Sequence, residues 1–458
     1  MISSNFDRNA SNQDSRNAKL PFYCVILTLL VAIGGFENGL NTGITNIPEQ
    51  TIRNCSNGYK SVQGVGVPYC LPMGNLLWGF ATGGHPLGAI IGGLSAGSLQ
   101  TILGRKKALI YNSIFWIIGG VLLGASVNPG MFICGRILTG IGTGVGSVVI
   151  PTYLGEISTI RSRGLVGSVY QDSVVIGIVV SQLISLPLTY IPGWRILLTL
   201  TSAIAILQLI LIPIIGVETP RYLISQNQIS KAKETLQKLR KGYNIDLEFD
   251  EILQGQSEKQ INEINENTIE KDEKYIQNSL VETNNQFEIK KSSSFKDILQ
   301  DSYCRKALFI CIGTHIAQQL NGIQAIVYYS TGIFLTVMGD SAKYVTLIIG
   351  SALLLVTLTS TFLIDRMGRR PLLLLSEIGV TFACFLIVIG SIYENNILLI
   401  IALSLLELCR SLSSQMEEAL QDYTFLIFGV IGVFCIIFIW IFVPETKGKS
   451  IEEITSKK

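Results

Sequence analysis

Three residues in one long apolar stretch share a helix face and could bind a polar molecule. Gln171, Ile178 and Gln182 follow one another at i, i+7 and i+11, which places all three on the same side of a helix. A glutamine amide donates and accepts hydrogen bonds without carrying a charge. Its desolvation costs less than that of a carboxylate, so this face suits the hydroxyl groups of a neutral, polyhydroxylated ligand.

A second amide group occurs in a later apolar stretch. His315, Gln319 and Gly322 lie at i, i+4 and i+7 on one helix stripe, whereas Gln324 lies off that stripe in an ideal helix. A break in the helix at Gly322 would bring Gln324 to the same side, and irregular backbone at membrane depth is tolerated where it lines a cavity. Two amide stripes from opposite ends of the chain suggest one central site. The alternative is that these amides only join helices to one another, as polar side chains do in membrane bundles.

The elements that must position these amides are membrane spans. Of the 458 residues, 48% are hydrophobic and only 15% are charged, which is typical of an integral membrane protein. We predict ten full spans, because about 20 apolar residues are needed to cross the hydrocarbon as a helix. They cover residues 22–43, 74–97, 107–126, 131–153, 165–188, 194–216, 306–335, 343–364, 371–392 and 423–443. Residues 397–421 hold too short an apolar run for an eleventh span.

The loops set the orientation of the spans. Three loops carry clustered basic residues and are expected in the cytosol by the positive-inside rule. They contain Arg105, Lys106 and Lys107; Arg161 and Arg163; and Arg366, Arg369 and Arg370. With ten spans both termini lie in the cytosol, and the N-terminal segment shows no signal peptide.

One long polar segment divides the chain. It is rich in Glu, Lys, Asn, Gln and Ser, and it contains an amphipathic helical stretch at 230–239. The predicted organisation is an N-terminal tail (1–21), an N-terminal six-helix bundle (22–222), a partly disordered cytosolic linker (223–304), a truncated C-terminal helical bundle (305–443) and a C-terminal tail (444–458).

Other site chemistries find little support. Nine cysteines without a CxxC pair and two histidines argue against a metal site or a cofactor, and no nucleophile, base and orienter set indicates an enzyme. Cys55 and Cys70 both lie in the polar segment between the first two spans, where they could form a disulfide or stay as free thiols. Asn54 begins an N-x-S triplet in the same segment and is a candidate glycosylation site if that loop is extracellular.

The two halves of the chain look like duplicates. LGRKKALIY follows the second span and MGRRPLLLL follows the eighth; VETPR follows the sixth and VPETKG the last. Gly104 and Gly368 lie 264 positions apart, whereas Glu218 and Glu445 lie only 227 apart. The second half has therefore lost about 37 residues, equivalent to one helix and a loop or parts of two.

Taken in order, several segments resemble the sugar porter family of the major facilitator superfamily, and within it the facilitative hexose (glucose) transporters. They are GLNTGITNIP, GRILTG, PTYLGEISTIRSRG, VETPRYL, QQLNGIQAIVYYST, DRMGRR and VPETKGKS. The resemblance implies a major facilitator fold, an all-α membrane protein of two pseudo-symmetric bundles, here with most of spans ten and eleven missing. It further implies a transporter of a hexose in the plasma membrane, in contact with membrane lipid and with no nucleic-acid or obligate protein partner.

The resemblance also assigns site residues. Gln171, Gln318, Gln319 and Gln324 stand at the family's sugar-binding positions, with Ile178 and Gln182 on the wall of the pathway. A cytosolic ionic latch that holds the outward-facing state would comprise Arg105, Glu156, Arg163, Glu218, Arg221, Asp365, Arg366, Arg369, Arg370 and Glu445. One departure is Leu353, which stands where the family's pattern has an asparagine at a sugar position.

Three functional interpretations follow. Passive uptake of a hexose by alternating access is favoured, because Asn41 stands where related proton-linked symporters have an aspartate. Proton symport stays open because Glu37 and Asp172 are acids within predicted spans, where a charge is costly. A truncated isoform or gene-model variant that does not transport is the third, since a bundle lacking one wall should leak or fail to pack.

Overall fold

A computed structural model describes most of the N-terminal part of the chain and one long helix of the C-terminal part. The described residues are 20–53, 66–159, 161–254, 339–367 and the single positions 331, 335, 378, 379, 382 and 386; in the last helix, side chains are described as far as 359. Within these ranges the regular structure is helical and no strand occurs.

Seven of the described helices are long and apolar enough to cross a membrane. They are α2 (Phe22–Gly43), α4 (Asn75–Leu103), α5 (Arg105–Gly124), α6 (Pro129–Ile157), α7 (Arg163–Leu188), α8 (Gly193–Ile215) and α16 (Ala342–Met367). Each coincides with a predicted span, with ends that differ by up to six residues, the largest difference being at the end of α4. These seven predictions are confirmed, and the other three spans lie wholly or largely outside the described residues.

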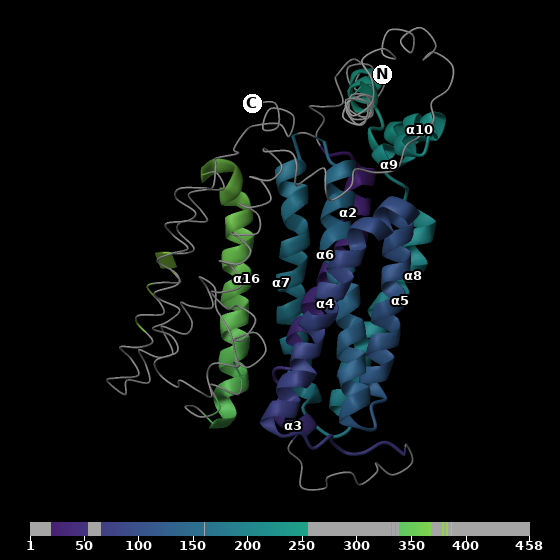
Figure 1. The fold of residues 1–458 in the computed structure, drawn as a ribbon. Helices are drawn as coiled ribbons and strands as arrows, with labels where there is room; N and C mark the ends of the chain where they lie inside the picture. The colour runs from purple at the N-terminus through teal and green to yellow at the C-terminus, as the bar shows by residue number, and fades with distance from the viewer. Residues whose placement is uncertain are drawn as a thin grey trace, which may run out of the picture.

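Four shorter elements lie at the ends of the spans. They are α3 (Glu49–Arg53), α9 (Pro220–Ser225), α10 (Ile229–Leu239) and η2 (Gly339–Ser341). Helix α10 confirms the amphipathic stretch predicted at 230–239. In Figure 1, α9 and α10 cap one end of the N-terminal bundle, α3 lies at the opposite end, and α16 stands beside α7.

Local sequence explains where several helices begin and end. Asn128 caps α6, because its side-chain oxygen accepts a hydrogen bond from the amide of Met131 at 2.8 Å and Pro129 fills the first helical position. Gly104 separates α4 from α5 with a φ of 86°, a backbone conformation that costs glycine nothing. Thr219 caps α9 in the same way as Asn128 caps α6, again with a proline next in sequence.

Glycine lets pairs of helices touch through their backbones. A Cβ added to Gly144 of α6 would overlap the carbonyl oxygen of Ala89 on α4, and one added to Gly39 of α2 would overlap that of Val174 on α7. Small residues permit such close approach, which is the usual way for helices to pack in lipid. The N-terminal bundle is therefore joined along two seams, α4 with α6 and α2 with α7.

A buried arginine fastens the end of the bundle where α3 lies. Arg195 donates hydrogen bonds to the carbonyl oxygens of Gly124, Ser126 and Pro68 at 2.9, 2.7 and 2.8 Å. Its guanidinium also lies over the ring of Trp194, 4.1 Å from the centroid. The clamp satisfies carbonyls at the end of α5 and holds the segment that leads into α4.

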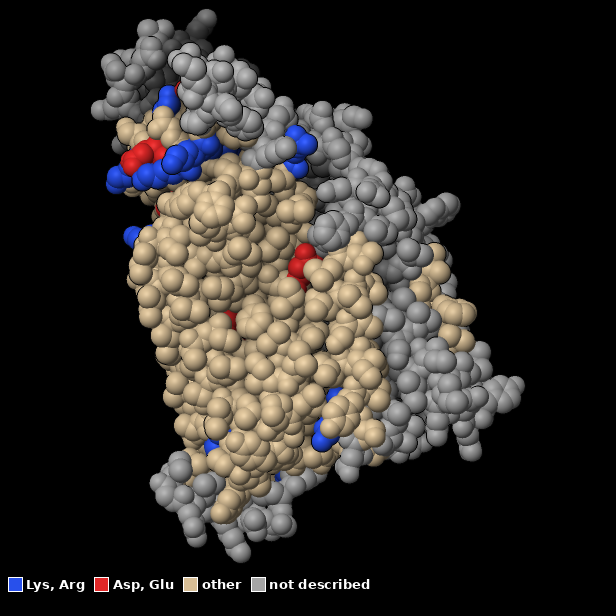
Figure 2. Space-filling view, turned by 180° about the vertical axis from the view of Figure 1, so that it is seen from behind, with Lys and Arg blue, Asp and Glu red and all other residues tan. Residues whose placement is uncertain are grey.

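Charge is concentrated at the ends of the molecule. In the space-filling view, Lys, Arg, Asp and Glu gather mainly at the end that carries α9 and α10, and a broad band below it holds few charged side chains (Figure 2). This distribution suits helices that cross a membrane, with the basic end expected in the cytosol.

Candidate functional site

The amide stripe of α7 lies along the contact between the N-terminal bundle and α16. Ile178 and Gln182 are buried, whereas Gln171, nearer the end that carries α9 and α10, is exposed. A Cβ added to Gly350 of α16 would meet the amide of Gln182, so Gln182 lies directly against the C-terminal part of the chain. Because the three residues share one helix face, Gln171 is on the side of α7 that faces α16.

The opposing face of α16 changes character along its length. Thr346, Gly350 and Leu353 lie at i, i+4 and i+7 on one stripe, and Leu353 is buried. The stripe is polar at Thr346, has no side chain at Gly350, where Gln182 packs, and is apolar at Leu353. The other predicted binding residues, Gln318, Gln319 and Gln324, and with them His315 and Gly322, lie outside the described residues.

A hydrogen bond joins the two parts of the chain at the α3 end, and a second bond ties it to α16. The amide of Thr331 donates to Oδ1 of Asn46 at 3.1 Å, and the hydroxyl of Thr331 lies 3.0 Å from that of Thr346. Asn46 belongs to the turn that follows α2, whereas Thr346 is in α16. Sequence reasoning did not single out this bridge, because Asn46 and Thr331 are far apart in the chain.

The opposite end carries an ion pair and a capping carboxylate. Nη2 of Arg105 lies 2.8 Å from Oε1 of Glu156, which links the start of α5 to the last turn of α6. Oε1 of Glu218 accepts hydrogen bonds from the amides of Arg105 at 3.0 Å and Lys106 at 3.2 Å, so it caps α5. Burial raises the pKa of Glu218, while the amide donors of Thr219, Lys106 and Arg105 oppose the shift.

The remaining predicted latch residues are placed only in part. Arg163 is the first residue of α7 and Arg221 lies in α9, both half-buried at the same end. Asp365 and Arg366 belong to the end of α16, beyond the last described side chain. Arg369, Arg370 and Glu445 lie outside the described residues.

Two predicted buried acids differ in their surroundings. Glu37 is fully buried, and the amide of Asn41 donates to its Oε2 at 3.4 Å, while Oε1 has no hydrogen-bond partner. Asn41 in turn accepts a 2.7 Å hydrogen bond on its backbone carbonyl from the buried Arg136 of α6. Asp172 is half-buried on α7. Glu37 therefore lies within the N-terminal bundle rather than on its surface.

The segment between α2 and α4 contains one of the two cysteines considered for a disulfide within the described residues. Cys70 is fully buried and disulfide-bonded; Cys55 and Asn54 lie outside the described residues, so their pairing and glycosylation stay predictions. Among the described residues no three His, Cys, Asp or Glu side chains are grouped to hold a metal ion.

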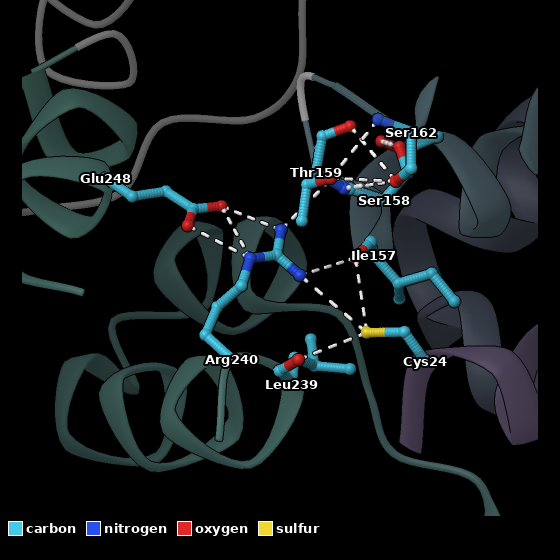
Figure 3. Close-up of polar contacts among 9 residues, drawn as sticks. Cys24, Ile157, Ser158, Thr159, Ser162, Leu239, Arg240 and Glu248 are labelled. Atoms are coloured by element: carbon cyan, nitrogen blue, oxygen red, sulfur yellow. Dashed lines mark hydrogen bonds and ion pairs between the residues drawn. The ribbon is translucent and has the colours of Figure 1, made fainter. Parts of the chain in front are cut away.

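Sequence reasoning also missed a buried arginine near α10. Arg240 follows α10 and is almost fully buried, with its guanidinium against the ends of α2 and α6 (Figure 3). The amphipathic pattern predicted α10 itself. It gave no sign that the charged residue next to it would be buried.

The chain is similar to known transporter proteins. A family profile described as "Sugar (and other) transporter" matches residues 27–409 and 407–457. The two matches meet at 407–409, within the region where the sequence predicts about 37 missing residues.

Curated relatives align over nearly the whole chain. Horse "Solute carrier family 2, facilitated glucose transporter member 5" is 30% identical over 496 residues, covering 96% of this chain and 92% of the relative. Human "Solute carrier family 2, facilitated glucose transporter member 4" is 28% identical over 486 residues, covering 94% and 90%. These relatives are transporters and not enzymes, as the sequence predicts for this chain.

Solved structures share the fold. The major facilitator superfamily proton:xylose symporter XylE bound to 6-bromo-6-deoxy-D-glucose has a TM-score of 0.70 at 21% identity, covering 94% of this chain and 98% of that one. A partially occluded, inward-open structure of the xylose transporter XylE from E. coli has a TM-score of 0.65 at 20% identity, covering 94% and 100%. The predicted major facilitator fold is confirmed.

Proposed function

This chain belongs to the sugar transporter family of the major facilitator superfamily, and from that premise we propose that it carries a hexose, glucose foremost, across the membrane by facilitated diffusion. In the proposed mechanism the N-terminal and C-terminal parts rock about a central site between them. The names of the curated relatives support a facilitated glucose transporter.

The observation that carries the proposal is the contact between α7 and α16. It brings an amide stripe, with Gln182 against Gly350, to the boundary between the two parts. Sugar hydroxyls would bind there to Gln171 and Gln182, with Gln318, Gln319 and Gln324 completing the site and Ile178 contacting the apolar face of the sugar. Amides can replace the water around such hydroxyls without burying a charge.

The hydrogen bonds at the two ends fit alternating access. The bridge from Asn46 through Thr331 to Thr346 ties the two parts together at the outer end. We assign the Arg105–Glu156 pair and the Glu218 cap to the N-terminal half of a cytosolic latch. Bonds of this kind can break and re-form as the parts rock.

Uniport is proposed over proton symport because the α2 residue that contacts Arg136 is neutral Asn41. The buried Glu37 is the specific observation that favours symport as a second candidate, since one of its oxygens has no hydrogen-bond partner. A protonophore separates them: it should abolish accumulation by a symporter and leave equilibration by a uniporter unchanged.

A third candidate is a shortened, non-transporting form, which the meeting of the two profile matches at 407–409 favours. Sequencing the full transcript tests it, because a longer form that restores the missing segment would make this chain a splice or annotation product. We further propose a plasma-membrane location with both termini in the cytosol, Asn54 glycosylated and Cys55 paired with Cys70.

The direct test is uptake of labelled glucose by transporter-null cells that express the chain as written. We expect saturable uptake, and a KM about 3- to 10-fold higher in Gln182→Ala, the effect of one lost hydrogen bond. Gln228→Ala is the matched control, because that glutamine is exposed near the cytosolic end. Absence of saturable uptake in folded protein at the cell surface would reject the proposal for this chain.

A further inference from the structure

The cytosolic segment after α8 folds as a small helical unit with its own apolar core. Leu223 and Ile224 of α9 pack with Ala232 and Leu236 of α10 and with Phe249. Polar residues cover the outside, where Lys233 and Asp246 form an exposed ion pair at 3.0 Å. The burial of these apolar side chains stabilises the unit, so it can move as one rigid piece and transmit a displacement.

One arginine holds this unit against the transmembrane bundle. Arg240 is 1% exposed, and its guanidinium forms hydrogen bonds with Glu248 inside the unit, at 3.0 Å through Nε and 2.8 Å through Nη2. Its other donors reach outward to the carbonyl oxygens of Ile157 and Ser158, at 2.8 and 2.9 Å (Figure 3). Sγ of Cys24, near the start of α2, lies 3.8 Å from Nη1.

The contacts of Arg240 fall on a helix end that carries a latch residue. Ile157 is the last residue of α6 and Ser158 its C-cap. Carbonyls at a helix end have no partner within the helix and carry partial negative charge, so a guanidinium binds them well. Glu156, the next residue back, forms the 2.8 Å ion pair with Arg105 at the start of α5. The path from the cytosolic unit to that pair is contiguous.

We propose that Arg240 is a positioning residue for transport: it fixes the end of α6 so that Glu156 meets Arg105, and the folded cytosolic unit thereby sets the balance between outward- and inward-facing carriers. The inference rests on the proposed function, in which the pair belongs to the latch. Glu248 stabilises Arg240, because its carboxylate compensates the buried charge and fixes the plane of the guanidinium.

The test uses Arg240→Lys in the full-length protein. Lysine keeps the charge but replaces the planar fork by a single compact ammonium, so it loses the two-point contact with Glu248 and the spread of donors that reaches both carbonyls. We expect a weakened latch and fewer outward-facing carriers. The KM for sugar entry should rise and that for exit should fall, each by about fivefold, a size common for coupling between sites. Lys233→Gln is the matched control, because it breaks an exposed pair in the same unit without touching α6.

Two further measurements make the result decisive. Glu156→Gln should likewise raise the KM for entry and lower the KM for exit. Adding Arg240→Lys to it should change little, because both substitutions act on one ion pair. Amide hydrogen exchange at 154–163 should be faster in Arg240→Lys than in the control. Unchanged entry and exit KM values at reduced protein stability would show that Arg240 has only a structural role and overturn the inference.

Failure of the proposed function gives a different pattern. If the wild-type protein shows no saturable uptake, the transport proposal fails, and the exchange measurement alone decides whether Arg240 positions the end of α6. Equal exchange in Arg240→Lys and Lys233→Gln would then reject the positioning role.

Discussion

The carboxyl group of Glu49 makes the stability of the protein depend on pH in an unusual direction. Glu49 opens α3, between the first two spans, and is 6% exposed. Its Oε1 lies 3.1 Å from Nη1 of Arg53. Burial raises the pKa of Glu49 from 4.5 to about 7, and Arg53 only partly opposes the shift. The carboxyl therefore binds a proton more tightly in the folded protein than in the unfolded chain.

The size and sign of the effect follow from that difference. A pKa raised from 4.5 to about 7 corresponds to about 3 kcal/mol of folding free energy. This contribution is fully present below about pH 4.5 and is lost as the pH rises through about 7. The wild-type protein should lose stability between pH 5 and pH 8. Glu49→Gln, which is always neutral, should not lose this part.

The assay is thermal unfolding of the purified transporter in detergent at several pH values from 5 to 8. The midpoint of wild type relative to Glu49→Gln should fall from pH 5 to about 7 and level off toward pH 8. Glu234→Gln is the control, because Glu234 pairs with Lys238 on an exposed helix face and should change little. Parallel midpoints for wild type and Glu49→Gln at every pH would refute the reasoning, since a buried acid with a raised pKa cannot behave like an amide.

Three further changes test other contacts. Gly144→Leu should force α4 and α6 apart, because even a Cβ there overlaps the backbone of Ala89; destabilisation of about 1–3 kcal/mol and poor surface delivery in an expression assay are expected, and normal delivery would count against the seam. Glu37→Gln should leave sugar equilibration unchanged, with or without a protonophore. If wild type moves protons with sugar in proteoliposomes and Glu37→Gln does not, the protein is instead a proton symporter. Arg195→Met should leave three buried carbonyls without their donor and lower the unfolding free energy by about 3 kcal/mol or more, measured as a lower thermal midpoint; an unchanged midpoint would contradict the clamp.

The spans were predictable because crossing hydrocarbon imposes length and composition directly on the sequence. Residues 22–43 and 194–216 could be assigned almost to the residue, and the predicted amphipathic stretch became α10. The Gln171, Ile178 and Gln182 stripe follows from helical periodicity alone. What periodicity cannot supply is the partner across the boundary, so the position of Gln182 against Gly350 emerges only from the packing of α7 on α16.

The buried arginines were not predictable, for a different reason. Arg136, Arg195 and Arg240 bind backbone carbonyls of residues distant in the chain, and a carbonyl belongs to every residue, so no sequence pattern marks the acceptor. The bridge between Asn46 and Thr331 joins side chain to backbone in the same way. Contacts made by the main chain are thus where this sequence is least informative.

The backbone seams between helices have a mechanical consequence. Because α4 with α6 and α2 with α7 touch through their main chains, the N-terminal bundle resists sliding of one helix past another and should turn as a single lever. Helix α4 has 29 residues, a length of about 43 Å. A turn of about 10° around its middle would carry each tip roughly 4 Å, in opposite senses at the two membrane faces. A small tilt can thus separate hydrogen-bonded partners at one face while bringing others into reach at the opposite face.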